Sequence, residues 1–577
     1  MTETAPFAVR PGAGRLQDFE PLLPAELIVL RAAAAGSIAK VSLRRPRNPT
    51  SDPRVRAEFL GFLARGGGAG APVAGRLLQI LGASIVGRLD LASATVPMSL
   101  WLYRCLFSAV PVLENAHIAG SLSFVDCALL GLRADGCHID GELALSAGCN
   151  IDGDVHLAHT HIGRDLNCER LSLRGDSAEA GVLRQRLIAD AAQIGGDVKL
   201  GGGFEAMGEV RFVAARIAGS LCADMAHIAA DIDASGARGV ALDLDRVQVG
   251  ASVCLNRGFT AAGQVRMQQA RIDGDFDASG AAFDAIGDAS WGDTSAVLLL
   301  ARAHVGGTLD LRELQGPLQG ASLADAQVGT LLDDAATWGQ HHVLDGFSYG
   351  RLGDGAPTDA AMRLDWLGRQ DTRHLGTDFR PDPWRRLIGV LRRMGRHGSA
   401  REVAIGREHH LRSAGLIGQS APRALRWAAQ LGHDVFGALA GYGYRPLRLL
   451  ATAASIWLLC GAAYWAAAEH GGIAPSPITL AVDARLASCR PECSQLPITA
   501  PRFQPLLYSL DVLLPGVDLQ QTRHWAPARH ALGGELEALF GVPPLRMLTA
   551  FEALCGWIIA AGFFAIALHL HDRDRSV

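Results

Sequence analysis

Two stretches of the chain are closely similar: GFEAMGEVRFVAARIAGSL at 203–221 and GFTAAGQVRMQQARIDGDF at 258–276. Both end in a copy of the pattern small-x-Ile/Val-x-Gly-x-Leu/Val-x-apolar, with Phe276 at the Leu/Val position of the second, and in this pattern apolar or small residues recur at every second position. A period of two is typical of a β-strand with one buried face. Weaker copies included, the pattern begins at residues 83, 116, 137, 149, 160, 192, 215, 247, 270, 303 and 326. Each interval is within one residue of a multiple of eleven, so the sequence predicts a repeat protein.

An eleven-residue unit is long enough for one short strand and a corner. We therefore expect two or three units to close each turn of a parallel β-solenoid over 76–345, with small apolar side chains stacked inside. The alternate positions carry charged residues such as Arg88, Asp90, Arg271 and Asp273, which we expect on the outer faces. With ~22 residues per turn and ~4.8 Å between turns, residues 83–345 make about twelve turns and an axis of ~55 Å.

The chain has 577 residues, of which 49% are hydrophobic and 19% charged, and its mean hydropathy is +0.17. This composition excludes a disordered chain and indicates a membrane segment. The charge is segregated, because residues 76–345 carry a net −14 and residues 346–450 a net +8. A basic segment directly before an apolar helix is typical of the cytoplasmic side of a membrane protein and favours anionic lipid headgroups. DNA binding is the weaker interpretation, and we expect no nucleic-acid partner.

Two segments predict transmembrane helices. Residues 449–468 contain no charged residue and have about the length that crosses ~30 Å of hydrocarbon, and a second candidate runs from about 547 to 570. No secretion signal is expected in residues 1–15. Arginines precede the first segment and follow the second: Arg445, Arg448, Arg573 and Arg575. We therefore expect a multi-pass protein of the bacterial inner membrane, with both termini in the cytoplasm and 469–546 outside.

These features divide the chain into four parts. Residues 1–75 form an N-terminal segment with a capping helix, 76–345 the solenoid, 346–446 a basic helical neck and 447–577 the membrane domain. Within the neck we expect helices at 382–394 and 399–412, with Asp382 and Ser399 as N-caps. A structural collar is favoured over a DNA-reading helix-turn-helix. The apolar segment 503–514 predicts an interfacial or re-entrant helix.

Several segments resemble a family of bacterial membrane-anchored β-solenoid proteins that are similar in style to pentapeptide-repeat proteins. They are GEVRFVAARIAGSL, GQVRMQQARIDGDF, VLRRMGRHGSAREVAIGREHHLR, GYGYRPLRLL and FQPLLYSLDVLLPGVDLQQ. The resemblance implies a β-solenoid body attached to a membrane. Because members are often labelled "membrane-associated oxidoreductase", it also implies that activity. The strict pentapeptide pattern Ala-Asp/Asn-Leu-x-x is not maintained, which argues against the DNA-mimic role of some relatives.

The sequence offers little support for catalysis. A dinucleotide enzyme generally has a glycine-rich turn between a strand and a helix, and the nearest stretch, residues 66–71, is better explained as a linker. The HExxH, GxxxxGK[ST] and CxxC motifs are absent from the sequence. His156, His159 and His161 could hold zinc, but exposed solenoid histidines explain them better, and we expect no metal site and no cofactor. Seven cysteines of the repeat region are expected to be reduced packing residues, mostly inward: Cys105, Cys127, Cys137, Cys149, Cys168, Cys222 and Cys254.

Cys489 and Cys493 lie in the segment expected outside the cytoplasm, where thiols are oxidised. A short ring containing Pro491 can bring the two α-carbons within disulfide distance, so we predict a disulfide. Two free thiols are the alternative if the topology is inverted.

The function favoured by the sequence is a non-enzymatic membrane scaffold, whose repeated surface binds a protein partner and whose helix pair binds the bilayer. Self-association of the rods is a variant of this role. One alternative is an oligomeric two-helix channel, with Asp511 and Glu552 as the polar residues of functional interest in the membrane domain. A second alternative is the oxidoreductase that the family label implies.

Overall fold

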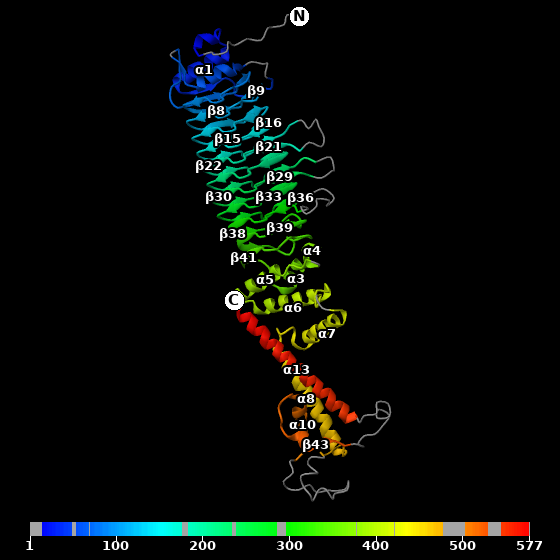
Figure 1. The fold of residues 1–577 in the computed structure, drawn as a ribbon. Helices are drawn as coiled ribbons and strands as arrows, with labels where there is room; N and C mark the ends of the chain where they lie inside the picture. Colours follow the sequence, from blue (N-terminus) through cyan, green and yellow to red (C-terminus); the bar gives the residue numbers. More distant parts are fainter. Residues whose placement is uncertain are drawn as a thin grey trace, which may run out of the picture. The chain divides into compact units, whose positions relative to one another are not determined.

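The computed structural model describes residues 14–48, 53–68, 70–175, 183–232, 238–284, 296–376, 378–419, 422–476, 502–528 and 544–575. The chain divides into two compact units, Met1–Val403 and Ala404–Val577. Parallel strands dominate unit 1 and helices dominate unit 2 (Figure 1). The boundary falls inside the predicted neck, so helices of that segment belong to different units.

Unit 1 is built on three large sheets. Sheet 1 has 21 strands among the described residues, in two columns that join at β38. The first column contains β7 (Thr95–Val96), β10 (His117–Ile118), β14 (His138–Ile139), β18 (His161–Ile162), β22 (Gln193–Ile194), β26 (Arg216–Ile217), β30 (Gln248–Val249), β34 (Arg271–Ile272), β38 (His304–Asp310), β40 (Gln327–Leu332) and β41 (Ser348–Leu352). The second contains β1 (Ile38–Lys40), β5 (Leu77–Leu81), β8 (Ser99–Tyr103), β11 (Leu122–Val125), β15 (Leu143–Ser146), β19 (Leu166–Asn167), β23 (Val198–Lys199), β27 (Leu221–Cys222), β31 (Val253–Cys254) and β35 (Phe276–Asp277).

The other two large sheets each form one column. Sheet 2 contains β2 (Arg54–Arg56), β6 (Ser84–Val86), β9 (Leu106–Phe107), β12 (Ala128–Leu129), β16 (Asn150–Ile151), β20 (Ser172–Leu173), β24 (Glu205–Met207), β28 (His227–Ala229), β32 (Thr260–Ala262) and β36 (Ala282–Asp284). Sheet 3 contains β13 (Leu132–Arg133), β17 (Val155–His156), β21 (Gln185–Ile188), β25 (Glu209–Arg211), β29 (Val240–Asp243), β33 (Gln264–Arg266), β37 (Leu298–Leu299) and β39 (Ala321–Ser322). The prediction of a mainly β body followed by helices is confirmed.

The chain visits the sheets in a fixed order. After β10 and β11 in sheet 1 it enters sheet 2 as β12 and sheet 3 as β13, then returns to sheet 1 as β14. Each circuit pairs in parallel with the one before, as Leu78 does with Leu100 and His138 with His161. The repeat copies that begin at 83 and 149 lie in sheet 2, whereas that at 116 lies in sheet 1. In the short circuits the offset between paired strands is 21 to 23 residues, close to two repeat units, so one eleven-residue unit is half of such a circuit.

Some intervals between repeat copies are close to 33 residues, or three units. They do not arise from a third strand unit of the same kind but from a longer connection between two strands. From β18 to β38, every second circuit has a long connection from sheet 2 to sheet 3, as from β20, which ends at Leu173, to β21, which begins at Gln185. In the circuit between them, β24 ends at Met207 and β25 begins at Glu209. The extra residues of the long circuits therefore fall in the sequence between the strand of sheet 2 and the strand of sheet 3.

Side chains of matching positions stack in the interior. Ile118, Ile139 and Ile162 are neighbours in register and are fully buried. Burial of each such side chain contributes roughly 1.5–3 kcal/mol. Shortly before β10 and before β14 the chain turns through a residue in the left-handed conformation, which is Asn115 (φ +56°) in the first case and Gly136 (φ +66°) in the second. Asparagine and glycine adopt this conformation at low cost.

Five of the seven repeat cysteines are buried as expected: Cys105, Cys127, Cys137, Cys149 and Cys168. Burial raises the pKa of Cys137 and of Cys149 to about 12, so these thiols stay protonated and inert. Cys222 and Cys254 are only half-buried, because Leu221 and Val253 occupy the inward positions beside them.

The N-terminal end of unit 1 is covered by helical elements. They are the 3-10 turn η1 (Leu16–Phe19), α1 (Pro24–Ala35) and α2 (Ala57–Ala64), with a small antiparallel pair β3 (Gly67–Gly68) and β4 (Ala71–Pro72). Glu26 of α1 is fully buried and forms an ion pair of 2.6 Å with Arg56 at the end of β2. This pair ties α1 to the first strand of sheet 2.

At the other end, α3 (Ala360–Gly368), α4 (Thr372–Leu375) and α5 (Asp382–Arg393) follow β41. Strand β41 is the last strand of its column in sheet 1, and arginines of α5 donate hydrogen bonds to its carbonyls. Arg386 Nε lies 3.1 Å from the carbonyl oxygen of Tyr349, and Arg393 Nη2 lies 3.4 Å from that of Gly350. Part of the basic charge of the neck thus covers a sheet edge, which would otherwise be free to pair with another chain.

Beyond α5 the chain is helical. It forms α6 (His397–Ser413), α7 (Arg423–Ala440), α8 (Pro446–Glu469), α10 (Pro505–Leu513), α11 (Gln521–His524) and α13 (Pro544–Arg575), and a short antiparallel pair β42 (Ile473–Pro475) and β43 (Trp525–Pro527). The two predicted neck helices are confirmed as α5 and α6. Their first residues differ, because Pro381 is the N-cap of α5 and α6 begins before Ser399, at His397. Within the described residues, α8 and the first part of α13 (Pro544–Ala567) are long and apolar enough to cross a membrane.

Candidate functional site

The outward side chains of the first column of sheet 1 form one continuous row of polar residues. Each precedes the buried Ile or Val of its strand and pairs in register with the next. The row is Thr95, His117, His138, His161, Gln193, Arg216, Gln248, Arg271, His304 and Gln327. All are exposed or half-exposed. We call this row the outer column.

A shallow groove of about 360 Å³ follows the outer column from β18 to β34. Its lining includes Gln193, Arg216 and Gln248, together with small residues such as Gly195 and Gly250. A β-carbon at Gly195 would lie too close to a carbonyl oxygen of the preceding circuit, at 2.4 Å, so adjacent turns approach closely only because this residue is glycine. The groove therefore offers side-chain amide and guanidinium donors to a bound segment.

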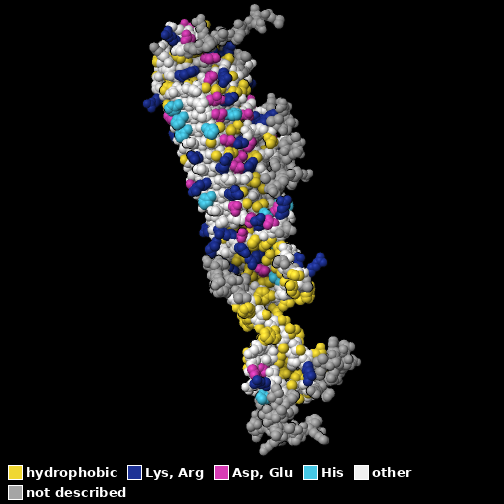
Figure 2. All heavy atoms as spheres, in the orientation of Figure 1, with side chains coloured by type: hydrophobic (Ala, Val, Ile, Leu, Met, Phe, Trp, Pro, Cys, Tyr) yellow, Lys and Arg dark blue, Asp and Glu magenta, His cyan; other side chains and the backbone are white. Residues whose placement is uncertain are grey.

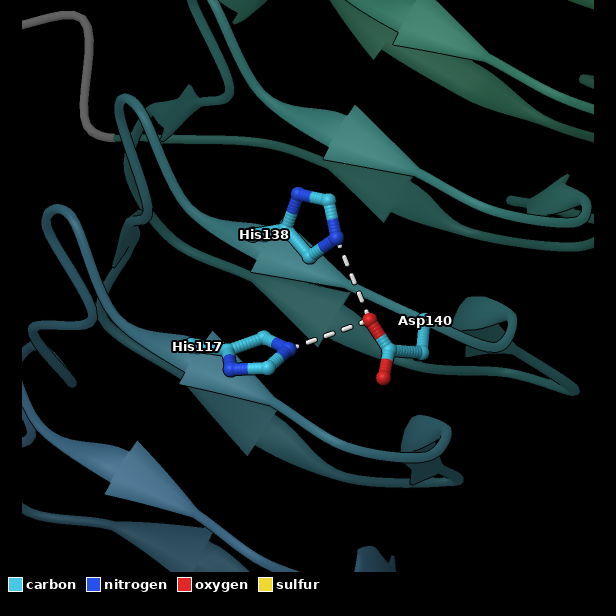
Figure 3. Close-up of side chains that lie close together, drawn as sticks. All are labelled: His117, His138 and Asp140. Carbon is cyan, nitrogen blue, oxygen red and sulfur yellow. Dashed lines mark hydrogen bonds and ion pairs between the residues drawn. The ribbon is translucent and has the colours of Figure 1, made fainter.

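Next to the start of this groove, three side chains converge (Figure 3). Nε2 of His117 and Nε2 of His138 each lie 3.1 Å from the same oxygen, Oδ1 of Asp140. The ring of His138 also stacks on that of His161, with centroids 4.4 Å apart and planes 7° from parallel. Among the described residues, this is the group of His, Cys, Asp or Glu whose possible ligand atoms all lie within 4.8 Å of one another.

This cluster differs from the histidines that the sequence singled out. His156 lies in β17 of sheet 3, His159 is a left-handed corner residue, and His161 lies in β18 of sheet 1. The sequence interpretation missed His117, His138 and Asp140. The sequence does contain an indication of this cluster, because both histidines directly precede the Ile of their repeat copies. It predicts that the two side chains are neighbours only once the two copies are known to pair as adjacent strands.

In unit 2, Glu552 of α13 is fully buried where α8, α10 and α13 meet. Its carboxylate accepts a hydrogen bond of 2.7 Å from the hydroxyl of Tyr464 in α8 and another from the hydroxyl of Ser509 in α10. Glu552 therefore joins three helices through side-chain hydrogen bonds.

Asp511 lies near the end of α10 and is 8% exposed. Its carboxylate accepts hydrogen bonds from the Leu519 amide (2.7 Å) and from both the amide and the hydroxyl of Thr522 (2.8 Å each). These contacts fix the chain reversal after α10. The structure therefore gives Asp511 and Glu552 different partners, in different parts of the domain.

The outer surface of unit 2 is strongly apolar. Figure 2 shows charged and histidine side chains spread over the strand-rich unit, and hydrophobic side chains gathered on the helices of unit 2. Exposed large apolar residues on α8 and α13 include Leu459 (71%), Trp465 (62%), Trp557 (66%) and Phe564 (67%). Helix α7 has a similar face, and its apolar residues border a groove of about 450 Å³ against α8 and α13. A surface of this kind is typical of contact with lipid or with another apolar partner.

Cys489 and Cys493 lie outside the described residues, so their predicted disulfide stays a prediction. Comparisons of the chain with protein-family models, with curated proteins and with solved structures found no match.

Proposed function

We propose that this chain is a membrane-anchored scaffold: a parallel β-solenoid in the cytoplasm that presents the outer column to a protein partner, held to the bilayer by α8 and α13. The observation that carries the proposal is the outer column itself. It places polar side chains at the spacing of adjacent strands, ~4.8 Å, along ten successive strands. An extended partner segment can contact such a row at many points.

The solenoid is supported by the path of the chain. Three parallel sheets are visited in one order, and each circuit stacks in register on the one before. In a β-solenoid each turn contacts its neighbours only, and extended binding surfaces follow from that regularity. The resemblance to membrane-anchored solenoid proteins points in the same direction.

Membrane anchoring is supported by the exposure of α8 and α13. In water, a helix rich in Leu, Trp and Phe buries most of these side chains, yet here only 22% of the most apolar stretch of either helix is buried. Lipid is the solvent that accepts such a surface. The basic residues before α8 and after the span of α13 favour cytoplasmic ends at the inner membrane.

We favour the scaffold over a channel, because the acidic groups Asp511 and Glu552 are both engaged by donors of their own domain. An ion-selecting carboxylate has to face the permeating ion. The oxidoreductase of the family label is also less favoured, since the sequence lacks a motif for a redox cofactor.

The test compares partner recovery by the full-length protein with that by two charge-reversal variants. Arg216→Glu with Arg271→Glu alters the groove, whereas Arg170→Glu with Arg257→Glu alters two exposed corner residues outside the groove's lining. Cross-linking in cells followed by mass spectrometry should show a partner that the groove variant loses and the corner variant retains. The proposal that residues 76–345 present a surface to a partner is refuted if both variants, and a protein that lacks residues 76–345, recover the same proteins.

A further inference from the structure

The pair His117 and His138 is created by strand pairing. They belong to successive repeat copies, but β10 and β14 are adjacent parallel strands in which His117 is aligned with His138. Both occupy the outer column, so their rings project to the same side. Asp140 directly follows β14, two residues after His138, and its carboxylate lies within reach of both rings.

The distances among these groups are those of a metal-ligand set. Zinc binds imidazole nitrogen at ~2.0–2.1 Å and carboxylate oxygen at ~2.0–2.2 Å, so ligand atoms around a tetrahedral ion lie ~3.4 Å apart. Here the two nitrogen-to-oxygen distances are 3.1 Å, and all possible ligand atoms lie within 4.8 Å. Small rotations of exposed side chains are enough to place an ion between them.

The hydrogen bonds of the cluster show how an ion would be accommodated. Asp140 Oδ1 accepts from Nε2 of both rings when these nitrogens carry their protons. An ion bound at the same place takes the Nε2 lone pair of each ring, and each ring stays neutral because its one proton then lies on Nδ1. The stacked ring of His161 restricts rotation of His138 and so helps to hold its nitrogen in position.

We propose that His117, His138 and Asp140 form a surface binding site for a divalent transition metal ion of the zinc class. Two imidazoles and one carboxylate suit Zn²⁺, Ni²⁺ or Cu²⁺, whereas Ca²⁺ and Mg²⁺ require more oxygen ligands. Three protein ligands leave a fourth position for water or for a side chain of a partner. The side chains of the three residues are each 47% exposed, so a water-filled approach is open. This site is independent of the scaffold proposal.

The experiment is a calorimetric titration of Zn²⁺ into the full-length protein in detergent. The protein is purified without a histidine tag, stripped with a chelator and treated with N-ethylmaleimide, which blocks accessible thiols. We expect the wild type to show a binding event that weakens at least tenfold in His138→Ala and in Asp140→Asn. It should also weaken from pH 7.5 to pH 5.5, because protons compete for imidazole, and Ca²⁺ and Mg²⁺ should not reproduce it.

The matched control is His304→Ala. His304 occupies the same outer column and is exposed, but its neighbours in register are Arg271 and Gln327, which do not complete a ligand set with it. The control should bind Zn²⁺ as the wild type does. Equal binding by wild type, His138→Ala and Asp140→Asn, or an equal loss in His304→Ala, overturns the proposal.

Discussion

Replacement of Arg363 by methionine should destabilise the C-terminal end of unit 1. The side chains of Arg363 and Asp333 are both fully buried. Nη1 and Nη2 of Arg363 donate to the two oxygens of Asp333 at 2.7 Å each, and Trp338 Nε1 donates to the same carboxylate at 2.7 Å. The pair joins α3 to the chain segment directly after β40.

The magnitude follows from what Arg363→Met leaves behind. The Asp333 carboxylate keeps the Trp338 donor but loses its counter-charge, and an uncompensated buried charge costs about 3–5 kcal/mol. The double variant Asp333→Leu with Arg363→Met removes both charges and should recover much of that loss. Arg385→Met is the control, because Arg385 pairs with Asp382 at 3.6 Å and both side chains are more than 60% exposed. Such surface pairs contribute about 1 kcal/mol or less.

The assay is urea unfolding of the full-length protein in detergent, followed by tryptophan fluorescence, since Trp338 and Trp366 lie beside the pair. We expect Arg363→Met to unfold at a clearly lower urea concentration than either the double variant or the control. If Arg363→Met matches Arg385→Met, or if the double variant is less stable than the single one, the reasoning about the buried charge is wrong.

Three further predictions concern other buried or edge contacts. Burial lowers the pKa of His342 from 6.5 to about 4, so the neutral ring in the folded state costs nothing above pH 6.5. As the pH falls from 6.5 to 4, the unfolded chain takes up a proton that the folded chain does not, and the free energy of unfolding should fall by roughly 3 kcal/mol. Urea unfolding of His342→Gln at several pH values should show a shallower decline than that of the wild type. Arg386→Ala exposes the edge of β41, and light scattering should show faster aggregation than with Arg385→Ala; equal rates contradict edge protection. Glu552→Leu leaves the hydroxyls of Tyr464 and Ser509 without their carboxylate acceptor, so its thermal unfolding temperature in detergent should fall further than that of Glu552→Gln, and the reverse order would contradict this role.

Much of unit 1 follows from local pattern. Alternation of apolar and polar residues predicts strands, and a spacing in multiples of eleven predicts their regular recurrence, because both depend on residues close together in the chain. The same holds for α5, α6, α8 and α13, whose apolar stripes or runs are continuous in the sequence. The spacing did not determine how many eleven-residue units make one circuit. A longer connection between two strands and an additional strand would each lengthen the interval by about eleven residues, so the sequence cannot separate them.

The sequence by itself determined the strand repeat, the segregation of charge and the two apolar helices, because these are properties of neighbouring residues. The tertiary structure alone decided which repeat copies pair, and therefore that His117 meets His138 and Asp140 while His156 lies in another sheet. It also decided that Arg363 is buried against Asp333 and that Arg386 covers a sheet edge. The physical reason is that these contacts join distant positions of the chain, and their energies depend on packing and burial that no short stretch of sequence specifies.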